Sequence, residues 1–210
     1  MAAALVLFLW MANELLRGEI LRFDSTVRNA VHAWASPALT YLMRGVTELG
    51  EVPFLVVLGA ILVWRLAASG RRRAAVIFVL AVAGAEALDQ ILKLVFQRAR
   101  PAAYFGLVQP ATYSFPSGHA LVATIFYGVV AAILTVREPS RPRRIAIWTL
   151  AALAAGLIGL SRVYLGVHYP SDVLAGYAAA VIWVSAVRIA YRIWLRRAPG
   201  RDAPPAHADR

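Results

Sequence analysis

Long apolar runs alternate along the chain with short polar segments that carry arginine, proline and glycine. An apolar run of about 20 residues crosses a bilayer as a helix, and a shorter run is marginal. Six runs predict membrane helices, and their approximate ranges are 2–16, 53–66, 74–94, 119–136, 145–160 and 172–195. For the first run, an interfacial or re-entrant segment is the alternative. The pattern therefore predicts an all-α polytopic membrane bundle of about six transmembrane helices.

Residues 17–51 show a different pattern, in which apolar residues recur near helical spacing with charged residues between them. The apolar positions are Phe23, Val27, Val31 and Trp34, and the charged positions are Arg22, Asp24 and Arg28. This pattern predicts an amphipathic helix at the membrane interface. Ser36 and Pro37 predict the start of a second short helix. A plain solvated connector is the alternative for the whole segment.

The composition supports a membrane protein. Hydrophobic residues make up 60% of the 210 residues and charged residues 16%. The mean hydropathy of +0.64 is too apolar for an ordinary soluble domain. Residues 1–197 are expected to form one membrane-embedded domain, whereas residues 198–210, rich in proline, alanine and charge, predict a disordered cytoplasmic tail. The chain has no cysteine, which excludes disulfides, thiolate catalysis and cysteine-ligated zinc.

The net charge of +11 is distributed in a way that predicts the orientation in the bilayer. Arginines cluster in residues 65–73, 137–144 and 192–201, after the second, fourth and sixth runs. Because cytoplasmic loops carry an excess of basic residues, both termini are expected in the cytoplasm. The segments after the first, third and fifth runs then face the periplasm or the outside of a plasma or inner membrane. Cations that flank apolar runs do not indicate nucleic-acid binding.

The polar segment after the third run has the features of an anion site. Lys93 and Arg100 are about two helical turns apart, so both can face one side. An ammonium provides a mobile positive charge, and a guanidinium provides a planar fork suited to phosphate oxygens. Ser117, Gly118 and His119 lie at a predicted helix N-terminus, where free N–H groups favour an anion.

The polar segment after the fifth run, Ser161 to Asp172, supplies a third cation and an acid–base pair. Arg162 lies six residues before His168, and Asp172 follows His168 by four. A carboxylate beside an imidazole fixes its tautomer and stabilises the imidazolium form. Two histidines suit in-line displacement at phosphorus, in which one attacks and the other protonates the leaving oxygen. Both polar segments are predicted on the outer face, so a phosphate site is expected there.

Residues inside the runs predict contacts within and between helices. Asp89 precedes Lys93 by four residues, so we expect the two side chains to pair, with a structural role for Asp89. Gly156 and Gly159 predict the close approach of another helix.

Three motifs resemble those of the type 2 phosphatidic acid phosphatase superfamily, which also includes glucose-6-phosphatase and the vanadium haloperoxidases. They are K-x6-RP at residues 93–101, PSGH at 116–119 and SR-x5-H-x3-D at 161–172. A lone PSGH is a weak signal, but three motifs in order at outward helix ends are specific. The resemblance covers roughly residues 53–187.

The resemblance implies the roles of individual residues. Five bind the phosphate group, namely Lys93, Arg100, Ser117, Gly118 through its amide, and Arg162. Three carry the acid–base chemistry: His168 as the nucleophile that forms a phosphohistidine, His119 as the general acid, and Asp172 as the carboxylate that orients His168. The resemblance implies no metal and no cofactor.

The implied function is that of an integral membrane lipid phosphatase, whose partners are a lipid phosphate substrate and the surrounding lipids. Resemblance to bacterial members implies undecaprenyl diphosphate, phosphatidylglycerol phosphate or phosphatidic acid as the substrate, with the first preferred. A non-catalytic lipid-binding membrane protein and a vanadate-dependent haloperoxidase are the alternatives. The complete set of acid–base residues argues against the former, and the membrane spans argue against the latter, whose known members are soluble.

Overall fold

The computed structural model describes residues 1–108 and 110–197, and this part of the chain forms eight α-helices and no β-strand. The helices are α1 (Ala2–Arg17), α2 (Leu21–His32), α3 (Pro37–Glu48), α4 (Val52–Ala68), α5 (Arg72–Phe96), α6 (Gly118–Thr135), α7 (Arg141–Tyr164) and α8 (Pro170–Arg197). The predicted all-α fold is confirmed. The tail predicted to be disordered, residues 198–210, lies outside the described residues.

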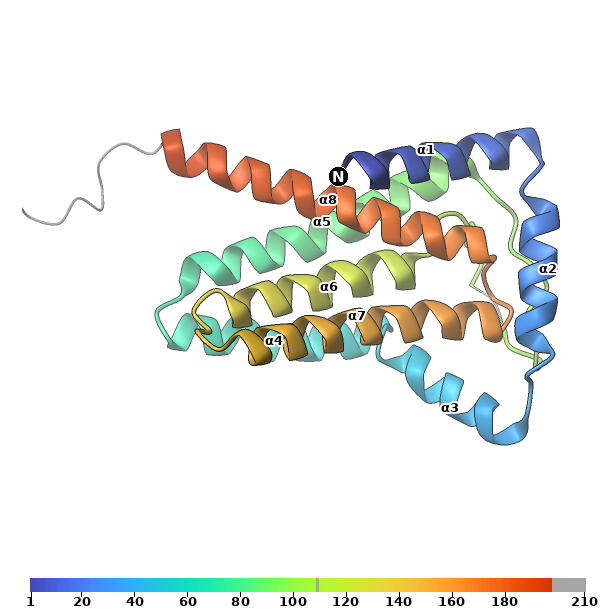
Figure 1. Ribbon diagram of the computed structural model, residues 1–210, viewed down its shortest axis with the longest axis horizontal. Helices are drawn as coiled ribbons and strands as arrows, with labels where there is room; N and C mark the ends of the chain where they lie inside the picture. The colour runs from blue at the N-terminus through green and yellow to red at the C-terminus, as the bar shows by residue number, and fades with distance from the viewer. Residues whose placement is uncertain (109, 198–210) are drawn as a thin grey trace, which may run out of the picture.

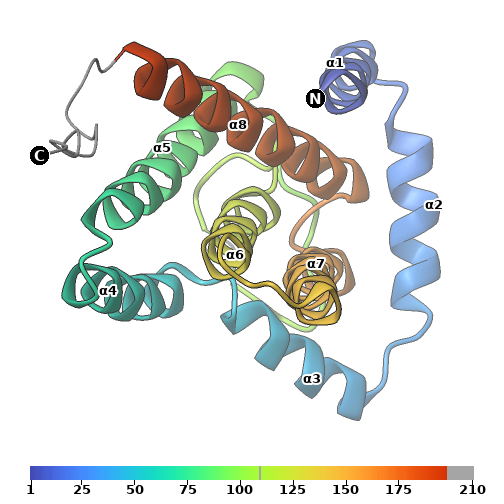
Figure 2. The same ribbon diagram turned by 60° about the vertical axis from the view of Figure 1, so that its left-hand side comes forward.

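Helix α6 lies at the centre of the bundle and packs against α5, α7 and α8 (Figure 2). The turns from α4 to α5 and from α6 to α7, which carry two of the arginine clusters, lie at one end (Figure 1). The last turns of α5 and α7 and the first turns of α6 and α8 lie at the opposite end (Figure 1). This opposite end is named the site end below.

Close packing between helices fills the interior, as expected where van der Waals contact rather than water exclusion drives association. Phe78 of α5 packs edge to face on Phe126 of α6, with ring centroids 5.3 Å apart. A Cβ on Gly159 would overlap the Tyr177 side chain of α8, which confirms the predicted close approach at that glycine. A Cβ on Gly156 would have open space, so the prediction is wrong there.

Within the described residues, four helices are long and apolar enough to cross a membrane, namely α5, α6, α7 and α8. Helices α3 and α4 meet at a 47° bend and make a fifth candidate if they form one span. Helix α1 has 16 residues and is about 24 Å long, shorter than the roughly 30 Å core of a bilayer. The protein is a multi-pass membrane protein, but the predicted count of six spans is not confirmed.

Helix α2 lies across the site end of the bundle (Figure 1), and it confirms the helix predicted within residues 17–51. Val31 is buried, whereas Phe23 and Trp34 are exposed, so only part of the predicted apolar stripe faces the protein. Asp24, one of the charged positions between the apolar ones, is fully buried. It contacts hydrogen-bond donors of Arg98 and Ser171, which the sequence pattern did not reveal.

Two of the three predicted phosphate-binding cations lie inside helices. Helix α7 extends beyond the predicted range 145–160 at both ends, which places Arg162 in its last turn. Lys93 lies in the last turn of α5. No proline or glycine follows either cation within its helix, so nothing ends the helix earlier. Their side chains therefore start from a rigid backbone.

Candidate active site

The site end carries all eight residues that the sequence singled out. They come from the four helix ends named above and from two connecting loops, residues 97–117 and 165–169. Backbone hydrogen bonds join these segments: the Tyr104 N–H donates to Leu165 O at 3.0 Å, and the Ser117 N–H donates to Asp172 O at 2.9 Å. The two motif-bearing segments, distant in sequence, thus lie against each other.

The His168 imidazole lies between a carboxylate and a guanidinium. Its Nδ1 atom is 3.4 Å from Asp172 Oδ2, and its Nε2 atom is 3.2 Å from Arg100 Nη1. Burial lowers the pKa of His168 to about 4, although the hydrogen bond with Asp172 opposes the shift. At neutral pH the ring is therefore neutral. When Nδ1–H donates to Asp172, the lone pair of Nε2 points toward the cations and can attack an electrophile.

Arg100 connects the two loops. Its Nε and Nη2 atoms donate to Thr112 O at 2.8 Å and to Thr112 Oγ1 at 2.9 Å, and Nη1 donates to Val167 O at 3.2 Å. Burial lowers the pKa of Arg100, and the charges of Asp172 and Asp89 oppose this shift. A guanidinium stays protonated in proteins. Arg100 thus holds a positive charge beside Nε2 of His168.

Arg162 brings a second guanidinium from the last turn of α7. Its Nη1 atom donates to Thr47 Oγ1 at 2.7 Å and lies 3.7 Å from Glu51 Oε1. Its Nε atom is buried and has no hydrogen-bond partner among the described residues. A buried donor without a partner costs about 1–3 kcal/mol. This N–H is therefore well suited to donate to an anion.

His119 lies in the first turn of α6, with its Nε2 atom 3.0 Å from Glu51 Oε1. Glu51 directly precedes α4, at the break between α3 and α4. The bend at this break brings Glu51 beside both His119 and Arg162. A carboxylate in contact with an imidazole fixes the orientation of the ring.

The predicted pair between Asp89 and Lys93 is confirmed, with Lys93 Nζ 2.5 Å from Asp89 Oδ2. The Asp89 carboxylate also lies against the first turn of α6, because a Cβ on Gly118 would be 2.9 Å from Asp89 Oδ2. Gly118 thus leaves room for Asp89, and Asp89 holds Lys93 near the N-terminus of α6. The free N–H groups of that turn favour negative charge.

Ser117 is the N-cap residue of α6 and is fully buried. Its Oγ atom has no hydrogen-bond partner in the part of the chain that the structure describes. Like Nε of Arg162, this hydroxyl is a buried polar atom at the site with unused hydrogen-bonding capacity. Both atoms suit the oxygens of a phosphate group.

The structure adds polar residues that the sequence did not assign to the site. They include Asp24, Thr47, Glu51, Arg98, Thr112, Ser114 and Ser171, and each contacts a predicted site residue or another member of this group. No motif marks them, and the Arg98–Asp24 contact joins positions 74 residues apart. The sequence carries no signal for this part of the site, because the burial of Asp24 is visible only in the structure.

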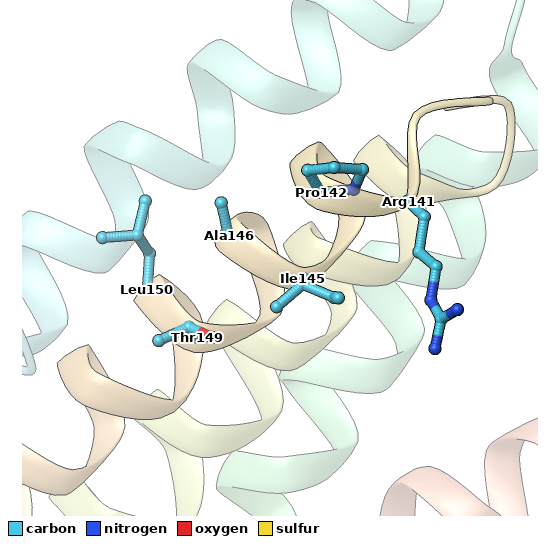
Figure 3. Close-up of a pocket in the computed structure, with 6 residues that line it drawn as sticks. All are labelled: Arg141, Pro142, Ile145, Ala146, Thr149 and Leu150. Carbon is cyan, nitrogen blue, oxygen red and sulfur yellow. The ribbon is translucent and has the colours of Figure 1, made fainter.

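The groove shown in Figure 3 lies over the first turns of α7, at the end of the bundle opposite the site. It is lined by Arg141, Pro142, Ile145, Ala146, Thr149 and Leu150. All six come from one helix, and none is an acid–base residue. This groove therefore does not compete with the site end as a catalytic centre.

A different groove gives access to the site end itself. It is lined by Gln90, Lys93, Leu94, Arg100 and the loop residues Pro110, Ala111, Thr112 and Tyr113. Two of the three predicted phosphate-binding cations therefore face an opening. The Nε2 side of His168 lies next to one of them, Arg100.

Sequence comparison places the chain among known phosphatases. The profile of the PAP2 superfamily matches residues 74–196. Phosphatidylglycerophosphatase B of Bacillus subtilis is 32% identical over 183 residues, which cover 83% of this chain and 86% of that protein. Undecaprenyl-diphosphatase of Sulfolobus acidocaldarius is 34% identical over 119 residues, which cover 54% of this chain and 53% of that protein.

Two crystal structures share the fold. The first transmembrane PAP2 type phosphatidylglycerolphosphate phosphatase from Bacillus subtilis superposes with a TM-score of 0.84 at 28% identity, covering 93% of this chain and 97% of that chain. Aquifex aeolicus LpxE, with a TM-score of 0.61 at 23% identity over 79% of this chain and 95% of that chain, supports the fold alone. The superfamily profile spans more than half of the chain, and the Bacillus subtilis relative aligns along most of both proteins, so the chain belongs to the PAP2 superfamily.

Proposed function

We propose that this phosphatase removes a phosphate group from a membrane lipid, either a phosphomonoester or a diphosphate, through a phosphohistidine on His168. The orientation of His168 carries the proposal, because Nδ1 faces Asp172 while Nε2 faces Arg100. One ring nitrogen is thus held by a carboxylate, and the other is directed to where cations would hold a phosphate.

In the first step, Nε2 of His168 attacks phosphorus, and the P–O bond to the lipid breaks as His119 gives its proton to the leaving oxygen. Asp172 stabilises the positive charge that develops on the His168 ring. In the second step, the now neutral His119 accepts a proton from water, and the water oxygen attacks phosphorus as the P–N bond breaks. The products are inorganic phosphate and either a lipid alcohol or, from a diphosphate, a lipid monophosphate.

The charges at the site support phosphoryl transfer without a metal. Lys93, Arg100 and Arg162 supply three positive charges from α5, α7 and the 97–117 loop. Cations placed in advance around the phosphoryl oxygens stabilise the charge of the transition state. The unpaired Ser117 Oγ and Arg162 Nε atoms offer two further hydrogen bonds in the same place.

An apolar groove between α4 and α5 supports a lipid as the substrate. It runs along α4 from Val52 to Val63 and is completed by α5 and by Val122 and Phe126 of α6. Val52 follows Glu51, which contacts His119 and Arg162. A hydrocarbon chain lying in this groove would therefore present its phosphate to the site end.

Phosphatidylglycerol phosphate is the first substrate to test. A phosphatidylglycerophosphatase aligns along most of this chain, whereas an undecaprenyl-diphosphatase aligns along about half of it. Undecaprenyl diphosphate, which the sequence resemblance favours, and phosphatidic acid are the other two substrates in the panel.

The site end is proposed to face the periplasm or the outside of a plasma or inner membrane, with both termini in the cytoplasm. The arginine clusters of residues 65–73 and 137–144 lie at the opposite end of the bundle, which supports this orientation.

Phosphate release from the three lipids by detergent-solubilised protein tests the function. We expect release that vanadate blocks and a chelator spares. His168→Ala should lower the rate by about 1,000-fold or more, as for other catalytic nucleophiles. Arg22→Gln, an exposed change on α2, serves as the control and should keep the wild-type rate. No release by the folded wild-type protein, or equal release by His168→Ala, would contradict the proposal.

A further inference from the structure

Arg98 lies between two buried carboxylates. Its Nη1 atom donates to Asp172 Oδ1 at 2.5 Å, and its Nη2 atom donates to Asp24 Oδ2 at 2.6 Å. The guanidinium also stacks over the Tyr169 ring, 3.9 Å from its centroid. The Arg98 side chain is 6% exposed, and both carboxylates are 0% exposed. Such contacts are short and shielded from water, so they persist where a surface ion pair would not.

Asp24 binds the first turn of α8 at the same time. Its Oδ1 atom accepts the Ser171 N–H at 2.9 Å, and its Oδ2 atom accepts the Ser171 hydroxyl at 2.7 Å. The Ser171 hydroxyl oxygen in turn accepts from Arg98 Nη1 at 2.8 Å. Asp24 thus neutralises Arg98 and joins α2 to the helix turn that carries Asp172.

The two oxygens of Asp172 have different partners. Oδ1 is held by Arg98, whereas Oδ2 accepts the Tyr169 N–H at 2.9 Å, the Ser114 hydroxyl, and the Nδ1 side of His168 at 3.4 Å. Because Arg98 fixes one oxygen, the carboxylate cannot turn about its Cβ–Cγ bond, and Oδ2 stays directed at His168. Removing Arg98 would leave Oδ1 buried without a strong donor, and only the partners of Oδ2 would then hold the carboxylate in place.

We propose that Arg98 is a positioning residue for the Asp172 carboxylate, and that Asp24 of helix α2 holds Arg98 in place. The inference rests on the proposed function, because it assigns Asp172 the task of orienting His168. It gives α2 a role in catalysis: this helix fixes the geometry of the His168–Asp172 pair although it carries none of the predicted phosphate ligands.

Charged groups other than Arg98 also surround His168 and affect its protonation. Asp172 of α8, Arg100 of the 97–117 loop and Arg162 of α7 all influence the imidazole directly. Lys93 and Asp89 of α5, His119 of α6 and Glu51 before α4 are further ionisable groups of the site end. A variant of Arg98 leaves these groups in place and removes a partner from Asp172, Asp24 and Ser171.

Four purified variants test the inference, namely Arg98→Gln, Arg98→Lys, Asp24→Asn and the double variant Asp24→Asn/Arg98→Gln. We expect Arg98→Gln to lower kcat by about 10- to 100-fold, by analogy with the outer partners of metal-ligating side chains, with KM changed by less than about threefold because the phosphate ligands stay. Arg98→Lys keeps one charge and should recover part of the loss. Arg22→Gln, on the same helix, should behave as the wild type.

The pH profile separates positioning from a purely structural role. Without the guanidinium at Oδ1, the negative charge of Asp172 is less neutralised and favours protonation of His168 more strongly, so the acid limb of kcat/KM should move to higher pH in Arg98→Gln. Asp24→Asn keeps the side-chain shape and Arg98 itself, so it provides a test even if Arg98→Gln does not fold. If Asp24 acts through Arg98, the double variant should lose no more activity than Arg98→Gln alone.

An unchanged kcat in folded Arg98→Gln and Asp24→Asn would overturn the inference. So would losses that multiply in the double variant, or a fall in kcat with an unmoved acid limb. In each case the wild-type protein still releases phosphate and the proposed function stands. Absence of phosphate release by the wild type, in contrast, is the failure of the proposed function itself.

Discussion

Glu51 and His119 contact each other across the site end, with Glu51 Oε1 3.0 Å from His119 Nε2. The same oxygen lies 3.7 Å from Arg162 Nη1, so one carboxylate touches both the proposed general acid and a proposed phosphate ligand. Its side chain is 39% exposed and can turn toward water when a leaving oxygen takes its place at Nε2. Glu51 is thus expected to keep the His119 ring in position between turnovers.

The need for a general acid depends on the leaving group, which provides a test of this pair. His119→Ala should slow the first step, release of the leaving group, by about 100-fold or more for an alkyl or lipid phosphate, but far less for an aryl phosphate, because an aryl oxide leaves without a proton. Glu51→Gln should also slow the reaction of the alkyl or lipid phosphate more than that of the aryl phosphate, but by a smaller factor than His119→Ala. Leaving-group release in the first turnover, measured with both substrates, isolates this step from the later hydrolysis of the phosphoenzyme, and equal losses on both would contradict the role of His119 as the general acid.

The Asp89–Lys93 pair should matter for binding more than for bond breaking. Asp89→Asn leaves the Lys93 charge in place but removes its 2.5 Å ionic partner, so we expect a loss of about 10-fold, mainly in KM and far smaller than that of His168→Ala. Gly118→Ala should reproduce it, because a Cβ there would lie 2.9 Å from Asp89 Oδ2. Values of kcat and KM for the folded Asp89→Asn and Gly118→Ala variants measure the effect. A loss in Asp89→Asn as large as that in His168→Ala would instead give Asp89 a direct catalytic role.

The burial of His168 predicts the acid limb of the pH profile. A protonated imidazole cannot attack phosphorus, and burial lowers the pKa of His168 from an ordinary 6.5 to about 4. Activity should therefore fall only as the pH drops through about 4. The second ionisation of a phosphomonoester lies near pH ~6, so kcat/KM should be measured with two substrates of different acidity. An acid limb whose midpoint shifts with the pKa of the substrate, or one with its midpoint at pH 6.5, would contradict the assignment to His168.

The sequence predicted the helices and the motif residues because both signals are local. Apolar runs mark helices within a few residues of their observed ends, and Lys93, Ser117 and His168 lie in short motifs with fixed spacing. The end of α7 was predicted too early because the polar residues Ser161 and Arg162 interrupt the apolar run. Polar side chains do not end a helix whose backbone hydrogen bonds continue.

The contacts around the motifs could not be predicted in the same way. Asp24 has the spacing of a polar-face residue of an amphipathic helix, and only packing against α8 reveals that it is buried. Glu51 reaches His119 because of the bend between α3 and α4. The angle of such a bend depends on tertiary packing and cannot be predicted from a single sequence. The number of spans could not be predicted for the same reason, since α1 and α4 are apolar but short and their pairing with neighbouring helices decides whether they cross the bilayer.

The absence of cysteine from the chain allows a direct test of orientation. Val108→Cys places a thiol at the site end, where the residue is 95% exposed, and Ser69→Cys places one in the turn between α4 and α5 at the opposite end. A membrane-impermeant maleimide added to intact cells should label the first variant and spare the second until the membrane is opened. The reverse pattern would place the site end in the cytoplasm.

Trapping of a phosphorylated enzyme tests the central claim most directly. His119→Ala lacks the proposed base for the second step but can still accept phosphate from an aryl phosphate, so the intermediate should accumulate. With a phosphorus-labelled substrate, denatured His119→Ala protein should carry label that is stable in alkali and lost in acid, as phosphohistidine is. The variant His168→Ala/His119→Ala should carry none. Label that persists in this double variant, or that resists acid as a phosphoserine does, would contradict His168 as the nucleophile.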